Sequence, residues 1–270
     1  MKKTCNSIYR TCLARFCLRL LLALIPLPAL YACNQDGKRA AALERKAAGK
    51  AVEAVVTDTA QAIKPRKAKS RTALYLDSLG YLNIAEADSN IVVDLMYTRA
   101  DNFTGKVLYE DLHEAYLHPD AMKSLEEAQR LLKEEHPSYS LIVYDAARPM
   151  SVQQTMWNAV KGTPKYIYVS NPARGGGLHN YGLAVDVSIV DGEGKPLPMG
   201  TPVDHLGREA HITAEAELVA QGKLTEAERQ NRLLLRRVMK AAGFRPLPSE
   251  WWHFNRYSRQ TAKERFQAIP

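Results

Sequence analysis

Two kinds of apolar pattern occur in turn along the chain from about residue 73 onward. Short runs rich in β-branched and aromatic side chains predict β-strands. They lie at 91–97, 139–144, 183–190 and 250–254. Longer stretches, in which apolar residues recur three or four positions apart, predict helices. They cover 119–135, 151–161 and 226 to about 243.

Local signals mark where several of these elements begin and end. Pro119 stands at the first position of its helix, where the missing N–H has no intrahelical partner to lose. Thr225 and Glu228 form a capping box, and Gly243 ends the same helix. A few strands together with segregated helices indicate a single α+β domain over residues 73–270.

Charge is distributed unevenly along the 270 residues, which carry 37 Lys+Arg and 29 Asp+Glu for a net charge of +8. Residues 1–72 hold 15 basic and 4 acidic residues, whereas residues 73–270 hold 22 and 25. The domain is therefore slightly acidic and lacks the basic face of a nucleic-acid-binding protein. A composition of 46% hydrophobic and 24% charged residues excludes collagen-like, wholly disordered and polytopic membrane classes.

The first 33 residues have the pattern of a secretory leader. All four cysteines lie there, so the remaining residues can form neither an internal disulfide nor a Cys-ligated metal site. Five basic residues accompany an apolar run at 20–32, which is shorter than the roughly 20 residues of a membrane-spanning helix. The residues up to Cys33 resemble a bacterial lipobox and predict that Cys33 is lipidated. A plain secretory signal or an inefficiently cleaved anchor is the alternative.

Residues 34–72 are rich in Ala and Lys and contain few large apolar side chains. Such a segment buries too little apolar area to offset its ordering entropy, which predicts a flexible basic tether. With lipid chains on Cys33, the protein is expected to be extracytoplasmic and anchored to a bacterial membrane. Asn34 is not the Asp that retains many Gram-negative lipoproteins at the inner membrane, which favours the outer membrane facing the periplasm in such a cell. The tether's charge either contacts anionic headgroups or polymer or is merely solvated.

Two clusters of metal-capable side chains lie in strand-like segments. His179 precedes Asp186 by seven residues, and Glu250 precedes His253 by three. A catalytic zinc ion takes three protein ligands and leaves a fourth position for water. His179, Asp186 and His253 supply such a set, and Glu250 is then free to act as a general acid and base. Taken singly, each residue is a weak signal, because a lone His or Asp is more often structural.

Two tryptophans stand between Glu250 and His253. Trp251 and Trp252 predict apolar walls around the site, which lower the local dielectric and favour a protonated carboxyl group. The same side chains also suit the hydrophobic core.

Several ordered blocks carry a family resemblance over residues 90–256. They are Asn-Phe-Thr-Gly at 102–105, Asp-Ala-Ala-Arg-Pro at 145–149, the segment 177–186, Met-Gly-Thr-Pro-Val-Asp at 199–204, Asn-Arg-Leu-Leu at 231–234, Gly-Phe at 243–244 and Glu-Trp-Trp-His-Phe at 250–254. This order resembles the VanX-type D-alanyl-D-alanine dipeptidases, within the zinc D-Ala-D-Ala metallopeptidases. The resemblance implies a hedgehog/D-Ala-D-Ala-peptidase-like α+β fold, in which a small antiparallel sheet carries the zinc site and the helices pack to one side.

The resemblance also implies a role for each matching residue. One zinc ion per chain would be bound by His179, Asp186 and His253. Glu250 would be the catalytic base, Arg148 would stabilise the oxyanion, and Asp204 would bind the free ammonium group of the substrate. A buried carboxylate that requires an ammonium partner rejects internal peptide bonds, which predicts a dipeptidase. Alternatively, Arg148 forms a structural ion pair with Asp145, and Asp204 is a turn residue in a loop.

Two positions depart from the family pattern. Gly177 stands where the family usually has a Ser that contacts the substrate, and Val203 stands where it usually has Phe. The expected reaction is hydrolysis of D-alanyl-D-alanine, or of a closely related cell-wall dipeptide, to free amino acids. The departures leave open a D,D-carboxypeptidase or endopeptidase that acts on longer peptidoglycan peptides. A non-catalytic, zinc-containing wall-binding lipoprotein is a third alternative, and no nucleic-acid or protein partner is expected.

Overall fold

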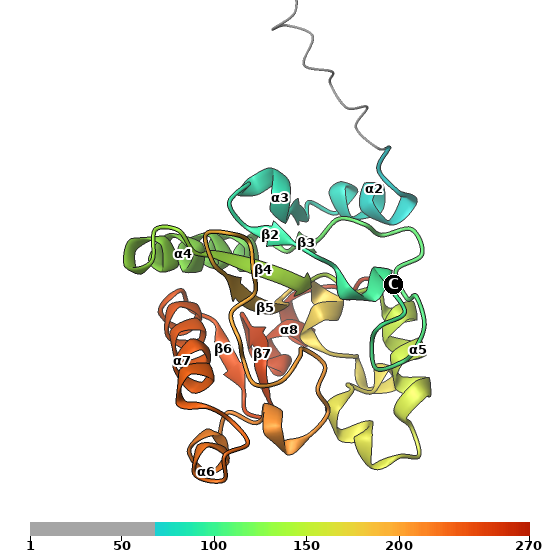
Figure 1. Ribbon diagram of the computed structural model, residues 1–270. Helices are drawn as coiled ribbons and strands as arrows, with labels where there is room; N and C mark the ends of the chain where they lie inside the picture. Colours follow the sequence, from blue (N-terminus) through green and yellow to red (C-terminus); the bar gives the residue numbers. More distant parts are fainter. Residues whose placement is uncertain (1–67) are drawn as a thin grey trace, which may run out of the picture. The chain divides into compact units, whose positions relative to one another are not determined.

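A mixed sheet of five strands organises the computed structural model, which describes residues 68–270 (Figure 1). The strands follow the order β2-β4-β5-β7-β6. Their bounds are Val92–Val93 (β2), Ser140–Asp145 (β4), Ala184–Val190 (β5), Arg245–Leu247 (β6) and Glu250–Asn255 (β7). A separate antiparallel pair is formed by β1 (Leu82–Asn83) and β3 (Tyr116–Leu117).

The middle strand, β5, positions the chemistry of the domain. All of its residues are buried, and it pairs antiparallel with β4 on one side and β7 on the other. The register places Asp186 opposite Asp145 of β4 and opposite His253 of β7. Residues that are far apart in the sequence therefore form one row across three strands.

Seven helices are present among the described residues. They are α2 (Arg71–Ser78), α3 (Ile84–Ala87), α4 (Pro119–Glu135), α5 (Met150–Val160), α6 (Glu215–Ala220), α7 (Glu226–Ala241) and α8 (Arg259–Arg265). Shorter 3-10 segments are η1 (Met96–Thr98), η2 (Pro164–Tyr168), η3 (Pro172–Arg174), η4 (Leu178–Tyr181) and η5 (Arg208–Ala210).

The two longest helices, α4 and α7, form a single layer against the sheet. They contact each other, and α4 also contacts β4 while α7 contacts β6 and β7. Leu125 and Leu132 of α4 are fully buried, as is Leu235 of α7. Burying a leucine side chain contributes about 1.5–3 kcal/mol, so this layer is a major part of the core.

Most of the predicted elements are confirmed. The helices expected at 119–135, 151–161 and 226–243 are α4, α5 and α7, and the strands expected at 139–144, 183–190 and 250–254 are β4, β5 and β7. The capping box of α7 is also present, because Glu228 accepts the Thr225 N–H at 2.8 Å and the Thr225 hydroxyl accepts the Glu228 N–H at 3.2 Å.

Two predictions about the sheet are wrong. Within 91–97 only Val92–Val93 forms a strand, and the chain then enters η1. This short edge strand runs parallel to β4, so the sheet is mixed and not antiparallel. Parallel neighbours need a long connection, which the segment containing α4 supplies. The sequence pattern also misses β6, because Pro246 lies within it; proline is tolerated there because β6 is an edge strand.

The predicted leader with Cys33, and residues 34–67 of the predicted tether, lie outside the described residues. The described part starts just before α2, which Ser70 caps by accepting the Ala73 N–H at 3.0 Å. The Thr72 hydroxyl donates to Asp111 at 2.8 Å, so the packed domain begins slightly before residue 73. Within residues 68–270, no helix combines the length and the apolar content that crossing a membrane requires.

Arg232 of α7 fastens the loop that follows β5. Its side chain is fully buried; Nε donates to the Met199 carbonyl at 2.7 Å, and both terminal nitrogens donate to the Glu209 carbonyl at 3.1 Å. The guanidinium also lies 5.6 Å from the ring centroid of Trp251. Since Asp204 lies between the two carbonyls in sequence, Arg232 fixes the loop that carries it.

We expect Arg232→Met to lower the free energy of unfolding by about 2–4 kcal/mol, because two buried carbonyl groups lose their donor. Urea denaturation measures this change. Arg237→Met on the exposed side of the same helix removes only a surface ion pair with Glu135, and it should cost less than about 1 kcal/mol. Equal effects of the two substitutions would contradict the anchoring role of Arg232.

Candidate metal centre and active site

A tight turn before β5 places His179 inside the domain. His179 lies in η4, and Gly182 ends this segment with φ 61°. A Cβ atom at Gly182 would stand 2.3 Å from a ring carbon of Tyr81, so the turn requires glycine both for its backbone angle and for its space. The chain then enters β5, which carries Asp186.

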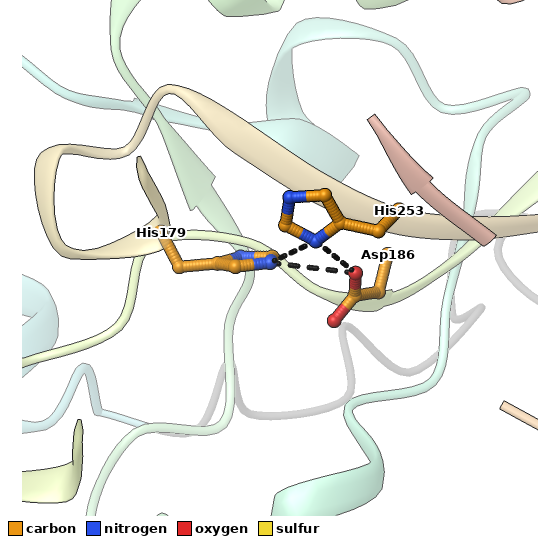
Figure 2. A group of neighbouring side chains, drawn as sticks. All are labelled: His179, Asp186 and His253. Atoms are coloured by element: carbon orange, nitrogen blue, oxygen red, sulfur yellow. Dashed lines mark hydrogen bonds and ion pairs between the residues drawn. The ribbon is translucent and has the colours of Figure 1, made fainter. Parts of the chain in front are cut away.

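His179, Asp186 and His253 each direct one ligand atom toward a common point (Figure 2). His179 Nε2 lies 3.1 Å from His253 Nδ1 and 3.3 Å from Asp186 Oδ1. His253 Nδ1 lies 3.0 Å from the same carboxylate oxygen. Three ligands of a tetrahedral zinc ion, each about 2.0–2.1 Å from it, stand about 3.3 Å apart. The structure thus brings the two sequence clusters together with spacings that fit one zinc ion.

The outer nitrogens of both histidines have oxygen acceptors. His179 Nδ1 lies 2.7 Å from the Ala146 carbonyl oxygen, and His253 Nε2 lies 2.9 Å from Asn255 Oδ1. With these protons directed outward, both inner nitrogens present lone pairs to the Asp186 carboxylate. Three side chains that converge in this way are consistent with a bound metal ion.

Glu250 lies beside the cluster at the start of β7. Its side chain is buried, and its Oε2 lies 3.9 Å from His253 Nδ1. Burial raises the pKa of Glu250 to about 7, while His253 acts in the opposite direction. The carboxyl group can therefore both accept and release a proton close to the three ligand atoms.

The Arg148 guanidinium is held by several neighbours. Nε and Nη2 both donate to Asp145 Oδ2, the former at 3.0 Å, and Nη1 donates to Gln153 Oε1 at 2.9 Å. Its Nη2 also lies 3.8 Å from Asp186 Oδ2, and its central carbon lies 5.3 Å from the ring centroid of Tyr97. The structural ion pair with Asp145 exists, and the same guanidinium lines the cavity over the ligand cluster. The two alternatives for Arg148 are thus compatible.

Asp204 faces the same cavity from the loop that Arg232 anchors. Its Oδ2 accepts the Tyr97 hydroxyl at 2.7 Å. Asp204 is also the one residue other than glycine with a positive φ, 64°, among residues 68–270, and such a backbone stores about 1–3 kcal/mol of strain. Burial, followed by the nearby Asp186, raises the pKa of Asp204 to about 7. A bound cation would favour the charged form of this carboxyl group.

One cavity of about 400 Å³ joins these groups, a size in the range of small-ligand sites. It is lined by all six residues singled out in the sequence, namely Arg148, His179, Asp186, Asp204, Glu250 and His253. The predicted tryptophan walls are wrong, because Trp251 and Trp252 lie in the core and do not line this cavity. Apolar wall is supplied instead by Phe103, Met156 and Leu206.

Sequence reasoning missed the residues that orient this site. Tyr97 holds Asp204, Gln153 holds Arg148, and Asn255 contacts His253. Two of these pairs could have been suspected from short separation in the sequence. No sequence signal points to Tyr97, because its partner is 107 residues away.

A buried His-Asp-His cluster beside a carboxyl group in a small cavity is the arrangement expected of a metallopeptidase. The sequence profile of the D-Ala-D-Ala dipeptidase family matches residues 77–269, and the chain belongs to this family.

Relatives named D-alanyl-D-alanine dipeptidase cover much of the same region. The protein from Escherichia coli is 31% identical over 178 residues, which span 66% of this chain and 85% of the relative. The protein from Synechocystis sp. is 29% identical over 171 residues, 52% of this chain and 68% of the relative. The protein from Enterococcus faecalis is 28% identical over 204 residues, 65% of this chain and 90% of the relative.

We expect the purified protein to bind about one zinc ion per chain and His179→Ala to reduce this content to near zero, because one of three ligands is lost. Metal analysis after gel filtration measures the content. His113→Ala, which changes an exposed histidine, should leave it unchanged. Full zinc content in the His179→Ala protein would place the metal elsewhere.

Proposed function

We propose that this protein is a zinc dipeptidase that hydrolyses D-alanyl-D-alanine, or a closely related cell-wall dipeptide, to free amino acids. The observation that carries the proposal is the convergence of His179, Asp186 and His253 beside Glu250 in one small cavity. Membership of the D-Ala-D-Ala dipeptidase family supports the same substrate class.

Glu250 is the proton carrier in this proposal. A zinc ion held by the three ligands supplies Lewis acidity and lowers the pKa of water. Glu250 takes a proton from the attacking water and delivers it to the amine that leaves when the peptide bond breaks. Its burial beside His253, with a pKa of about 7, suits a group that must do both.

Arg148 stabilises the negative charge that develops on the scissile carbonyl oxygen. Asp145 and Gln153 fix the guanidinium before the substrate arrives, so little reorganisation is needed when charge develops. A donor that is preorganised in this way commonly lowers the barrier by about 3–4 kcal/mol.

Asp204 binds the free ammonium group of the substrate. The carboxyl group is fixed by Tyr97 and by its unusual backbone angle. A peptide that is extended at its N-terminus has an uncharged amide in place of the ammonium group. The Asp204 carboxylate would then lack a cationic partner, so such peptides are rejected. This favours a dipeptidase over an endopeptidase.

We also propose that the protein is exported and anchored by lipid at Cys33. The support is the basic and apolar pattern of the first 33 residues and the lipobox-like residues before Cys33. Such an enzyme would act on wall-derived peptides outside the cytoplasm, in the periplasm if the cell is Gram-negative.

We expect Glu250→Gln to lower kcat for D-alanyl-D-alanine by about 10²–10⁴, since the amide cannot carry the proton. Zinc content should stay near one per chain. Glu264→Gln, an exposed change on α8, should retain normal turnover. Near-normal turnover in the zinc-loaded Glu250→Gln protein would contradict the mechanism, and a wild-type enzyme active only on longer wall peptides would contradict the substrate.

Asp204→Asn should lower kcat/KM for the free dipeptide by about ten- to a hundredfold, because the ammonium loses a charged partner. The N-acetylated dipeptide has no ammonium group and should be affected little. Steady-state kinetics on both peptides measure the contrast, with Asp101→Asn at an exposed position as the control. An equal loss on both peptides would remove the assigned role.

A further inference from the structure

Two arginines line the cavity without a carboxylate partner among the described residues. They are Arg245 on β6 and Arg259 at the start of α8, and both are exposed at the cavity's edge. Arg148, the third arginine of the cavity, is instead neutralised by Asp145. The proposed mechanism assigns no role to Arg245 or Arg259.

Arg245 is the register partner of a residue that contacts His253, one of the three residues of the ligand cluster. The register of β6 and β7 pairs Arg245 with Asn255, and Asn255 contacts His253 Nε2 at 2.9 Å. No side-chain hydrogen bond joins Arg245 to another residue in the described part of the chain. Its guanidinium is therefore available to a ligand that occupies the cavity.

Arg259 contacts the glycine run that precedes His179. Its Nη2 donates to the Gly176 carbonyl, only three residues before His179. Ser170 lies against the same glycine run, because its Oγ stands 3.1 Å from the place that a Cβ of Gly177 would occupy. Ser170 is also among the residues that line the cavity, so a hydroxyl and a guanidinium flank this run.

We propose that Arg259, together with Arg245 and the Ser170 hydroxyl, forms a subsite for a substrate carboxylate. Guanidinium groups bind carboxylates through charge-assisted hydrogen bonds, and an arginine with no internal anion loses no existing ion pair when it does so. The inference rests on the proposed peptidase function and extends it. The cavity then binds both ends of its substrate, the ammonium group at Asp204 and the carboxylate at these arginines.

Two sources could supply the carboxylate. One is the C-terminus of a dipeptide, and the other is an acidic side chain of a longer wall peptide. We favour the C-terminus, because the cavity of about 400 Å³ is of a size that suits a small ligand.

The test is peptide affinity in the zinc-loaded Glu250→Gln protein, which binds without turnover. Isothermal calorimetry would compare D-alanyl-D-alanine with its C-terminal amide, which keeps the ammonium but loses the carboxylate. We expect the acid to bind at least about tenfold more tightly than the amide. Adding Arg259→Gln should weaken binding of the acid by about ten- to a hundredfold and leave the amide unchanged.

Two further variants keep the test informative. Arg245→Gln removes a cation that makes no side-chain hydrogen bond within the described residues, so it should fold normally and reduce the preference for the acid. Arg265→Gln removes the same charge from the far end of α8, outside the cavity lining, and should leave the preference intact.

Equal affinity for acid and amide in the parent protein, or a preference that survives both Arg259→Gln and Arg245→Gln, would overturn the subsite. An acid preference that depends on Arg259, in a wild-type protein that hydrolyses no dipeptide, would instead sink the proposed function and leave the subsite standing. A dipeptide amide ending in D-glutamate separates the two sources, because its tight, Arg259-dependent binding would assign the subsite to a side-chain carboxylate.

Discussion

Three potential metal-ligand atoms meet within 3.3 Å of one another in the interior of this domain, an arrangement that a single metal ion would stabilise. The outer nitrogens of His179 and His253 already face oxygen acceptors, so neither ring can turn away without losing a hydrogen bond. The row across β4, β5 and β7 maintains this convergence, because Asp186 and His253 are register partners. A metal ion that joins them would also cross-link two neighbouring strands and η4.

The charged side chains around the ligand cluster differ in whether they have an oppositely charged partner. Asp145 uses its negative charge on Arg148, which leaves the guanidinium fixed and facing the cavity. Burial, reinforced by neighbouring carboxylates, raises the pKa of both Glu250 and Asp204 to about 7. Arg245 and Arg259 add positive charge, and neither has a carboxylate partner within residues 68–270. The cavity is thus suited to a small ligand that carries charges of both signs.

The sequence predicts those parts of the site that depend on local spacing or on a family pattern. The His179 to Asp186 and Glu250 to His253 clusters are visible in this way, and so are the long helices α4 and α7. Long-range pairing is not visible. The parallel placement of β2 depends on a connection through α4, and β6 contains a proline that disguises it. Tyr97 and Arg259 acquire their places only from the packing of distant segments, which leaves no mark on local composition. Trp251 and Trp252 show that nearness in sequence can also mislead. They stand between two site residues, yet their side chains pack in the core.

X-ray absorption at the zinc edge of the metal-loaded protein tests the central claim most directly, since it reports the atoms around the ion. Two imidazole nitrogens and carboxylate or water oxygens at about 2.0–2.1 Å, with no sulfur, are the result that a site of His179, Asp186 and His253 requires. All four cysteines lie in the first 33 residues, outside the domain. Sulfur at about 2.3 Å, or an all-oxygen shell without imidazole, would contradict the assignment.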